Sequence, residues 1–359
     1  MKRLLTTLTV MMLFCTLSPA QTVYYDASIL PLYGKATDAT GSRYERLPAS
    51  YESISRDAVW WLGRQSAGLF LRFRSNSTSI HARWTSTFGT HMDHMPETGS
   101  RGLDLYTLTD KGWKHIGTGR PSTDKTTDAV LVGNMDAADR EYMLYLSLYD
   151  GVSALEIGVD EGSYLEQPAV NTLKSDKPIV MYGTSILQGG CASRPGMAHT
   201  NIIARRLGRE VINLGFSGNA LLDLEIAELM ASVEDPAIYV LDYAPNAWDY
   251  LIREKGEQFF RILRDAHPDV PVIFIEDVHF SHYGYDNFIT NEVDKKNQAL
   301  RELFDKLKKQ GEKKIWYLTA KGLSLPDGEG SVDGTHYTDL GMVGYADYVT
   351  PVIKKHMLK

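Results

Sequence analysis

The sequence predicts a two-part α/β protein, in which an antiparallel β-sandwich precedes a three-layer α/β/α unit built on a parallel five-stranded sheet. From residue 23 to about 172, apolar residues recur with a period of two between polar turns. Beyond residue 175, short apolar runs alternate with long amphipathic stretches, which is typical of a parallel sheet covered on both faces. The length of 359 residues also exceeds that of a typical single domain, so two hydrophobic cores are expected.

The first twenty residues have the layout of a secretory signal peptide. Lys2 and Arg3 precede a mostly apolar stretch that ends at Leu17, and Ala20 supplies a small residue for cleavage. Threonines interrupt the apolar stretch, which is shorter than the roughly 20 residues that a membrane-spanning helix needs. We therefore expect an exported protein without a membrane span, either secreted or periplasmic, after cleavage near Ala20.

The net charge argues against nucleic acid as a partner, and the cysteine count argues against a stabilising disulfide. The formal net charge is −7, and removal of residues 1–20, which hold two basic residues and no acid, makes it −9. Nucleic acid is therefore not an expected partner, because binding it requires a clustered basic surface. Only Cys191 would remain of the two cysteines, so an intramolecular disulfide is excluded and Cys191 is interpreted as a small buried residue.

Residues 21–174 are predicted to form the amino-terminal sandwich. The pattern is clearest at residues 69–74 and 80–84, where every second side chain is apolar, and it returns at 144–148 and 155–159 across the turn at Asp150-Gly151. This alternation predicts antiparallel sheets that each bury one face.

Residues 175–359 are predicted to form the carboxy-terminal α/β domain, after a polar segment at 174–177. Amphipathic stretches at 250–266 and 291–309 predict helices that cover the sheet. The predicted strands are 178–182, 211–214, 238–242, 271–276 and 314–318.

Polar residues follow the predicted strands where each strand ends. Ser185 follows the first strand, Gly218 the second and Asn246 the third, while Asp333 and His336 follow the fifth. Ligands of an open parallel sheet gather beyond the carboxyl ends of its strands, so these residues are expected to converge on one edge.

The types of these residues predict a serine esterase. A serine hydroxyl is a weak nucleophile, so Ser185 would need His336 as general base, with Asp333 orienting the imidazole. The oxyanion formed from the attacked carbonyl would be bound by the backbone amides of Ser185 and Gly218 and the side-chain amide of Asn246.

The same residues resemble the SGNH or GDSL hydrolases, whose name lists a serine, a glycine, an asparagine and a histidine from four sequence blocks. Ser185, Gly218, Asn246 and His336 match these blocks in order, and Asp333 matches the family's D-x-x-H. The sequence departs from the family pattern in two places. Residues 183–185 read Gly-Thr-Ser in place of Gly-Asp-Ser, and Asn246 is preceded by Ala-Pro. The resemblance implies a flavodoxin-like order of strands.

A second motif extends the resemblance over nearly the whole mature chain. Gly102-Leu-Asp-Leu-Tyr106 resembles the G-x-D-L-Y motif that names the amino-terminal domain of a bacterial subgroup of these hydrolases. The subgroup implies hydrolysis of carboxylic esters, usually deacetylation, with an acylated carbohydrate as substrate and without a cofactor.

Other classes of function are weighed against this one. The α/β-hydrolase motif G-x-S-x-G is absent, because Leu187 stands in place of the second glycine. The histidine groups at 91–94 and at 279–282 lack the H-E-x-x-H frame and an obvious third ligand, so no metal is expected. A short-chain lipase or thioesterase would share the catalytic residues, and a carbohydrate-binding protein could retain the hydrolase scaffold.

Three residues are candidates for substrate binding. Trp248, two residues after Asn246, could present an apolar face to a sugar ring, whereas His279 and His282 follow the fourth predicted strand. Residues 92–98 are a candidate loop that reaches from the sandwich to cover the site. The oligomeric state is not indicated by the sequence.

Overall fold

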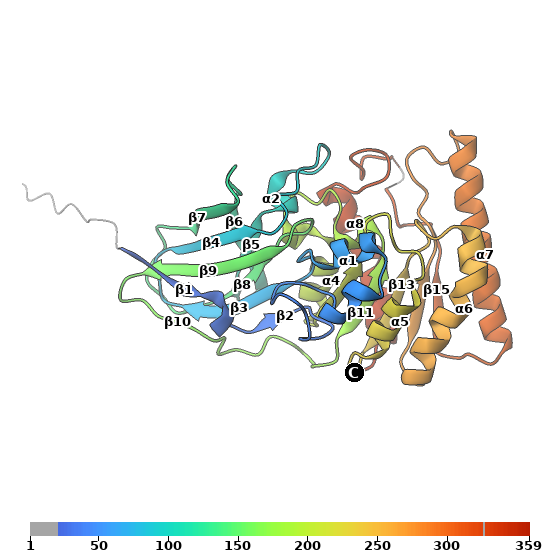
Figure 1. Cartoon of the computed structure of the whole chain (residues 1–359), viewed down its shortest axis with the longest axis horizontal. Coiled ribbons are helices and arrows are strands. Elements are labelled where there is room, and N and C mark those ends of the chain that lie inside the picture. Colours follow the sequence, from blue (N-terminus) through green and yellow to red (C-terminus); the bar gives the residue numbers. More distant parts are fainter. Residues whose placement is uncertain (1–20, 326) are drawn as a thin grey trace, which may run out of the picture.

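The computed structural model describes residues 21–325 and 327–359, and the predicted signal peptide lies outside them. A β-sandwich and an α/β unit lie next to each other along the longest axis of the molecule (Figure 1). Within the described part of the chain, no helix combines the length and the apolar character needed to cross a bilayer.

The amino-terminal part is an antiparallel sandwich of two sheets. The first sheet has the order β1 (Thr22–Asp26), β9 (Val152–Asp160), β4 (Ile80–Ser86) and β7 (Thr126–Val132). The second has the order β10 (Leu165–Glu166), β3 (Phe70–Ser75), β8 (Arg140–Tyr145), β5 (Leu103–Thr109) and β6 (Gly112–Gly119), and β2 (Leu32–Tyr33) also pairs with β3. Alternate residues such as Leu71, Phe73, Ile80 and Trp84 form the core between the sheets, as their period of two predicts.

The second sheet departs from the prediction that each sheet buries one face. Phe70, Tyr106, Met143 and Tyr145 form a second buried cluster on its outer side. The Tyr106 ring lies there under the guanidinium of Arg205, with 4.4 Å between the guanidinium carbon and the ring centroid. The outer face is therefore buried against the carboxy-terminal part, which a period of two cannot reveal.

The carboxy-terminal part contains a parallel sheet of five strands, in agreement with the predicted fold class. Its order is β12 (Val211–Gly215), β11 (Ile179–Gly183), β13 (Ile238–Asp242), β14 (Val272–Ile275) and β15 (Ile315–Leu318). The ends of the three strands on one side are in register, because Gly183 pairs with both Gly215 and Asp242. The loops that follow these strands therefore start at the same level.

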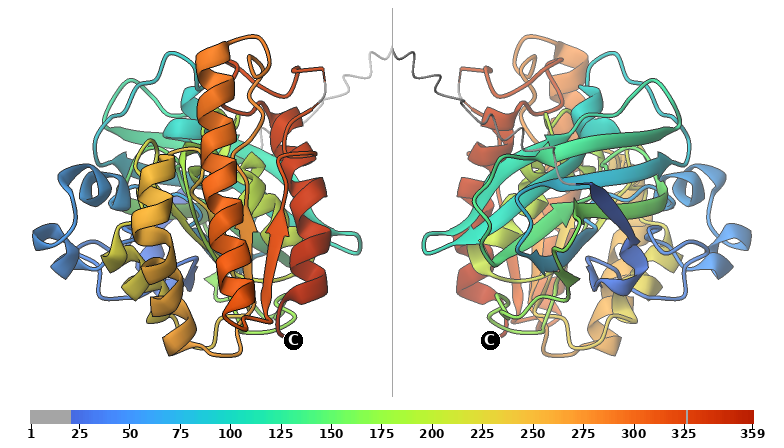
Figure 2. Two further views of the ribbon diagram at one scale, coloured as in Figure 1. Left: turned by 90° about the vertical axis from the view of Figure 1, so that its right-hand side faces the viewer. Right: turned by 90° about the vertical axis from the view of Figure 1, so that its left-hand side faces the viewer.

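Helices cover both faces of this sheet. The apolar side chains of α5 (Leu224–Ala231), α6 (Asp249–Ala266) and α7 (Asn287–Lys309) pack on one face, and those of α4 (His199–Leu207) and α8 (Asp339–His356) pack on the other. At the edge strand β15, Figure 2 shows α7 on one side and α8 on the other. Both faces are mostly apolar, which explains why the strands read as nearly continuous apolar runs.

Residues 44–65 connect the two parts. Leu47 and the helix α1 (Asp57–Gly63) contribute to the hydrophobic core under α5 and α6, although they precede most of the sandwich in sequence. Arg46 is almost completely buried, and its guanidinium donates to the carbonyls of Leu62 and Gln65 and to those of Asn213 and Gly215 in β12. Burial lowers the pKa of Arg46 to about 9, and the four carbonyls supply the partners that a buried cation needs.

Candidate functional site

Ser185 is the first residue of the short helix α3 (Ser185–Gln188), which follows β11 directly. The hydroxyl of Thr184 accepts a hydrogen bond from the amide of Ile186 and so caps this helix. Thr184, which stands in place of the aspartate of Gly-Asp-Ser, thus provides a capping oxygen. The loop holds Ser185 at the carboxyl edge of the sheet, where its side chain is largely buried.

Asp333 and His336 form a compact turn before α8. One carboxylate oxygen of Asp333 accepts from the amides of Thr335 and His336, at 2.9 and 2.7 Å, and the other contacts His336 Nδ1 at 2.7 Å. The side chain of Thr338 caps α8, so neither Asp333 nor Thr335 is the cap of this helix.

The turn brings His336 to Ser185, with 2.9 Å between His336 Nε2 and Ser185 Oγ. A carboxylate only accepts hydrogen bonds, so the neutral imidazole donates from Nδ1 to Asp333 and keeps the lone pair of Nε2 for the serine hydroxyl. Segments 151 positions apart thus form one chain of hydrogen bonds from carboxylate to imidazole to alcohol.

Asp333 is held in its charged form. Partial burial favours the protonated carboxyl, but the hydrogen bonds from the His336 ring and from the amides of His336 and Thr335 outweigh it and lower the pKa of Asp333 to about 2. The carboxylate can therefore orient His336, and stabilise its protonated ring, at any pH where the histidine acts as a base.

The two other predicted oxyanion-binding residues lie in the loops after β12 and β13. Gly218 has a φ of +69°, and a Cβ placed there would meet no atom within 4 Å, so open space adjoins its backbone. The carboxamide oxygen of Asn246 accepts from the amide of Ala220 at 3.3 Å, which leaves its NH₂ group as a donor. This bond ties the two loops together.

The candidate substrate-binding residues are spread over a wider area. Trp248 precedes α6 with 43% of its surface exposed. His279 stacks on Tyr283 with 4.0 Å between ring centroids, and His282 lies parallel to Phe280. None of the three has a hydrogen bond to Ser185, Asp333 or His336 within the described residues.

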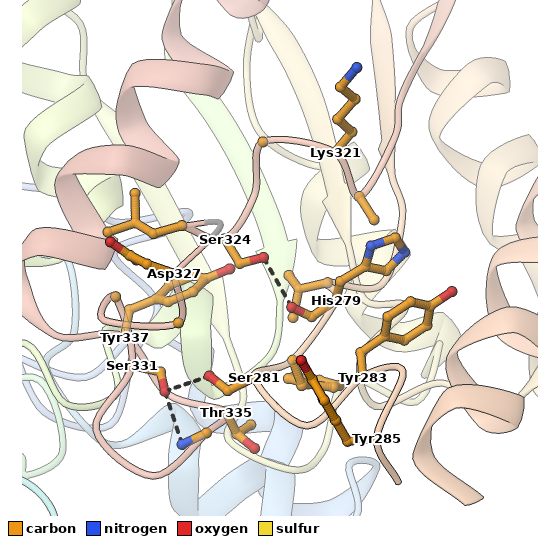
Figure 3. Close-up of a pocket in the computed structure, with 18 residues that line it drawn as sticks. His279, Ser281, Tyr283, Tyr285, Lys321, Ser324, Asp327, Ser331, Thr335 and Tyr337 are labelled. Carbon is orange, nitrogen blue, oxygen red and sulfur yellow. Dashed lines mark hydrogen bonds between the residues drawn. The ribbon is translucent and has the colours of Figure 1, made fainter. Parts of the chain in front are cut away.

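His279 also lines a pocket of about 390 Å³ next to the turn that carries His336 (Figure 3). Tyr283, Lys321 and Ser331 line it as well, and Ser331 accepts a hydrogen bond from the amide of Gly334. Ser185 and His336 do not line this pocket. The pocket therefore borders the site from the far side of the 333–336 turn.

The sandwich contributes groups that the sequence did not single out as site residues. The ring of His94 lies 5.4 Å from that of His336, centroid to centroid, so the loop at residues 92–98 does reach the site. The hydroxyl of Tyr149 donates to the carbonyl of Ser185 at 3.2 Å. Tyr149 ends an ordinary apolar run, which gives no signal of this contact.

The G-x-D-L-Y motif holds the chain that follows Ser185. Asp104 is completely buried and accepts from the guanidinium of Arg194, at 2.5 Å, and from the amide of Gly196, at 2.8 Å. The hydroxyl of Tyr106 accepts from the same guanidinium. A Cβ on Gly196 would lie 2.2 Å from that hydroxyl, so only glycine fits. The motif therefore anchors the loop 190–198 to the sandwich.

A buried acid lies below the site, at the end of β13. Asp242 is inaccessible to water and accepts a hydrogen bond from the hydroxyl of Tyr345. Burial, together with the nearby carboxyl of Asp277, raises the pKa of Asp242 to about 8 in spite of the hydrogen bond from Tyr345, which lowers it. Asp242 is therefore largely protonated at neutral pH.

Asp242→Asn is expected to flatten the dependence of stability on pH. Aspartate in an unfolded chain ionises near pH 4, roughly, whereas Asp242 in the folded protein keeps its proton up to about pH 8. Wild-type stability should fall as pH rises through this window, because the unfolded state loses the proton first. Asparagine is neutral throughout and retains an acceptor for Tyr345.

The measurement is the melting temperature of both proteins from pH 5 to pH 9. The wild-type protein should lose more stability than Asp242→Asn over this range. Equal slopes for the two proteins would show that Asp242 does not hold the proton.

The strand order, the sandwich and the loops at the carboxyl edge define a two-domain esterase fold of the SGNH type. The sequence profile of the GDSL-like lipase/acylhydrolase family matches residues 176–354. The profile of the GxDLY domain, described as the N-terminus of SGNH-hydro-type esterases, matches residues 22–165. No curated protein sequence gives a significant match.

Solved structures extend this similarity over both parts. A protein from Bacteroides ovatus ATCC 8483, described as a GDSL-like lipase, is 34% identical, with a TM-score of 0.89 over 94% of this chain and 99% of the other. The salicylyl-acyltransferase SsfX3 from a tetracycline biosynthetic pathway is 17% identical, with a TM-score of 0.72 over 92% and 95% of the two chains. A family two carbohydrate esterase from Clostridium thermocellum is 12% identical, with a TM-score of 0.60 over 80% and 92%.

The chain belongs to the GDSL-like lipase/acylhydrolase, or SGNH, family of carboxylic ester hydrolases. The resemblance inferred from its motifs is confirmed, for the hydrolase part and for the GxDLY part alike. The more distant structures share the fold.

Proposed function

We propose that this protein is an exported serine esterase that removes acyl groups, chiefly acetyl groups, from carbohydrates. The observation that carries the proposal is the hydrogen-bonded chain from Asp333 through His336 to Ser185. This chain supplies a nucleophile, a base and a group that orients the base, and it requires no cofactor.

The proposed reaction is a double displacement. Ser185 Oγ attacks the ester carbonyl while its proton moves to His336 Nε2, and the charge of Asp333 stabilises the imidazolium. The imidazolium then protonates the leaving sugar oxygen, and an acyl group remains on Ser185. Water repeats the sequence and releases the acid, so both half-reactions use the same three side chains.

The oxyanion would be bound by the amides of Ser185 and Gly218 and by the NH₂ group of Asn246. The exposed backbone at Gly218 supports this role, because no side chain stands between its amide and a substrate. The bond from Ala220 to Asn246 supports it as well, because it fixes the carboxamide before charge develops.

Asn246→Ala is expected to lower kcat by about 10² to 10³-fold, which is typical for the loss of one oxyanion donor. Asn246→Asp keeps an oxygen for the Ala220 amide but loses the NH₂ donor, so it should be impaired as well. Hydrolysis of an aryl acetate by both variants, with circular dichroism as a check on folding, tests the role. If Asn246→Asp retained wild-type kcat, the side chain would act only in joining the loops.

A carbohydrate substrate is proposed on two grounds. The motifs match the subgroup for which deacetylation of carbohydrate is inferred, and carbohydrate esterases of family two share the fold. The test is the release of acetate from a panel of acetylated oligosaccharides, compared with aryl esters of short and long acyl chains. Preference for long chains would indicate a lipase, and binding of sugars without any hydrolysis would indicate a carbohydrate-binding protein.

Export remains part of the proposal, supported by the layout of residues 1–20. Amino-terminal sequencing of the protein recovered from culture medium or periplasm should give Gln21 as the first residue. Recovery of full-length protein from the cytoplasm alone would contradict export.

A further inference from the structure

Three side chains with metal-binding atoms, one of them His336, meet beside Ser185. His94 comes from the sandwich, Cys191 from the loop after α3, and His336 from the turn before α8. One ligand atom from each residue, two nitrogens and a sulfur, lies within 4.8 Å of the other two. Two imidazoles and a thiolate are a ligand set that zinc prefers.

Both histidines are already oriented as metal ligands usually are. Asp93 Oδ1 lies 2.9 Å from Nδ1 of His94, and Asp333 Oδ2 lies 2.7 Å from Nδ1 of His336. A carboxylate on Nδ1 places the proton there and leaves the Nε2 lone pair free for a cation. Carboxylate–histidine pairs of this kind commonly surround zinc sites.

Cys191 is held in an unusual backbone conformation. Its φ is +68°, a value that costs a side-chain-bearing residue energy and that glycine adopts freely. Only 3% of its surface is exposed, and the neighbouring sequence is rich in glycine. Cys191 packs in the hydrophobic core that includes α4 and α8, in a backbone conformation suited to glycine, and its sulfur is the third possible ligand atom of the cluster.

We propose that His94, Cys191 and His336 form a binding site for a thiophilic divalent cation such as Zn²⁺, and that the bound cation inhibits the esterase. Inhibition follows because the cation occupies the lone pair of His336 that would accept the proton of Ser185. The bound cation would inhibit hydrolysis and would take no part in it. It is therefore not a catalytic cofactor.

Binding requires a modest contraction and the loss of one proton. Ligand atoms around tetrahedral zinc lie about 3.3 to 3.8 Å apart, given metal–ligand distances of about 2.0 to 2.3 Å. The His94 side chain is partly exposed on a loop and can make most of this movement. The thiol releases its proton to water as the sulfur–metal bond forms, and no electron is transferred.

The first test is direct binding, with Co²⁺ as a spectroscopic probe in place of Zn²⁺. Wild-type protein should bind one Co²⁺ and show a sulfur-to-cobalt charge-transfer band, which Cys191→Ala should lack. This readout does not depend on catalysis, so it separates failure of the metal site from failure of the proposed esterase function. Absence of the band in wild-type protein would overturn the proposal.

The second test is inhibition, which rests on the proposed role of His336. Zn²⁺ should inhibit aryl acetate hydrolysis reversibly, and EDTA should restore it. The Zn²⁺ concentration for half inhibition, relative to the uninhibited rate of each variant, should rise at least about tenfold in Cys191→Ala and His94→Gln. His91→Gln is the matched control, because His91 lies on the same loop and contacts Glu97 instead.

The control variant should keep wild-type sensitivity to Zn²⁺. Equal inhibition of wild type, Cys191→Ala and His94→Gln would overturn the proposal, because the cation would then act through other groups.

Discussion

Ser185→Ala should lower kcat/KM for an aryl acetate by about 10⁴ to 10⁶-fold, because the nucleophile of the acyl transfer is removed. The fold should be unaffected, since the side chain loses only its hydroxyl. His336 would then have no alcohol within reach, although its contact with Asp333 would remain. The rate is measured with circular dichroism as a control for folding.

Ser217→Ala provides a matched control, since Ser217 lies on a neighbouring loop and is outside the hydrogen-bonded chain of Asp333, His336 and Ser185. An aryl phosphonate should label the wild-type protein and Ser217→Ala, but not Ser185→Ala. A Ser185→Ala variant that kept its activity or was still labelled would show that another residue is the nucleophile.

Asp104→Ala is expected to cost about 3 to 5 kcal/mol of stability, as is typical when one partner of a buried ion pair is removed. Asp104 is completely buried, and the change removes the acceptor of the Gly196 amide and the carboxylate partner of Arg194, whose guanidinium keeps the Tyr106 hydroxyl as an acceptor. The loop that follows Ser185 loses its anchor, so kcat should fall by up to about 10²-fold as well. Chemical denaturation and steady-state kinetics measure the two effects.

Asp110→Ala is the control for this experiment, because Asp110 is an exposed aspartate in the same sheet's β5–β6 turn. It should change stability by less than about 0.5 kcal/mol. A double-mutant cycle with Arg194→Met should show coupling of about 0.5 to 3 kcal/mol between Asp104 and Arg194. Additive effects would mean that the ion pair between Asp104 and Arg194 does not anchor the loop.

Local sequence pattern predicts the strands of the parallel sheet well. Each observed strand lies within about one residue of its predicted range, because apolar runs buried on both faces end at glycine or polar residues. Apolar pattern alone does not mark the start of the last helix, α8. It begins at Asp339, because Thr338 caps a first turn that has little apolar character.

The outer face of the second sandwich sheet could not be predicted. Phe70 and Arg72 occupy the positions that alternation assigns to solvent, yet both are buried. Periodicity reports which side chains share a face, but it carries no information on what another part of the chain places over that face.

The candidate site also contains some residues that the sequence predicts and others that it does not. Asp333 and His336 could be linked from the sequence because their contact is made within one turn. The meeting of Ser185 with His336 followed from the rule that parallel strands end at one edge. His94 and Cys191 belong to separate segments without a shared motif, so only coordinates bring them together.

Arg46 limits how the protein can be divided. Its charge is solvated by carbonyls from the segment at residues 62–65 and from β12, so neither half of the chain alone offers this cation a complete set of acceptors. A fragment that contained only one half would expose apolar surface. It would also leave the Arg46 guanidinium, or the carbonyls of β12, without hydrogen-bond partners from the other half. Exchange of the sandwich for one from a distant relative would therefore have to transfer this guanidinium and its acceptors together, unlike the exchange of modules joined only by a tether.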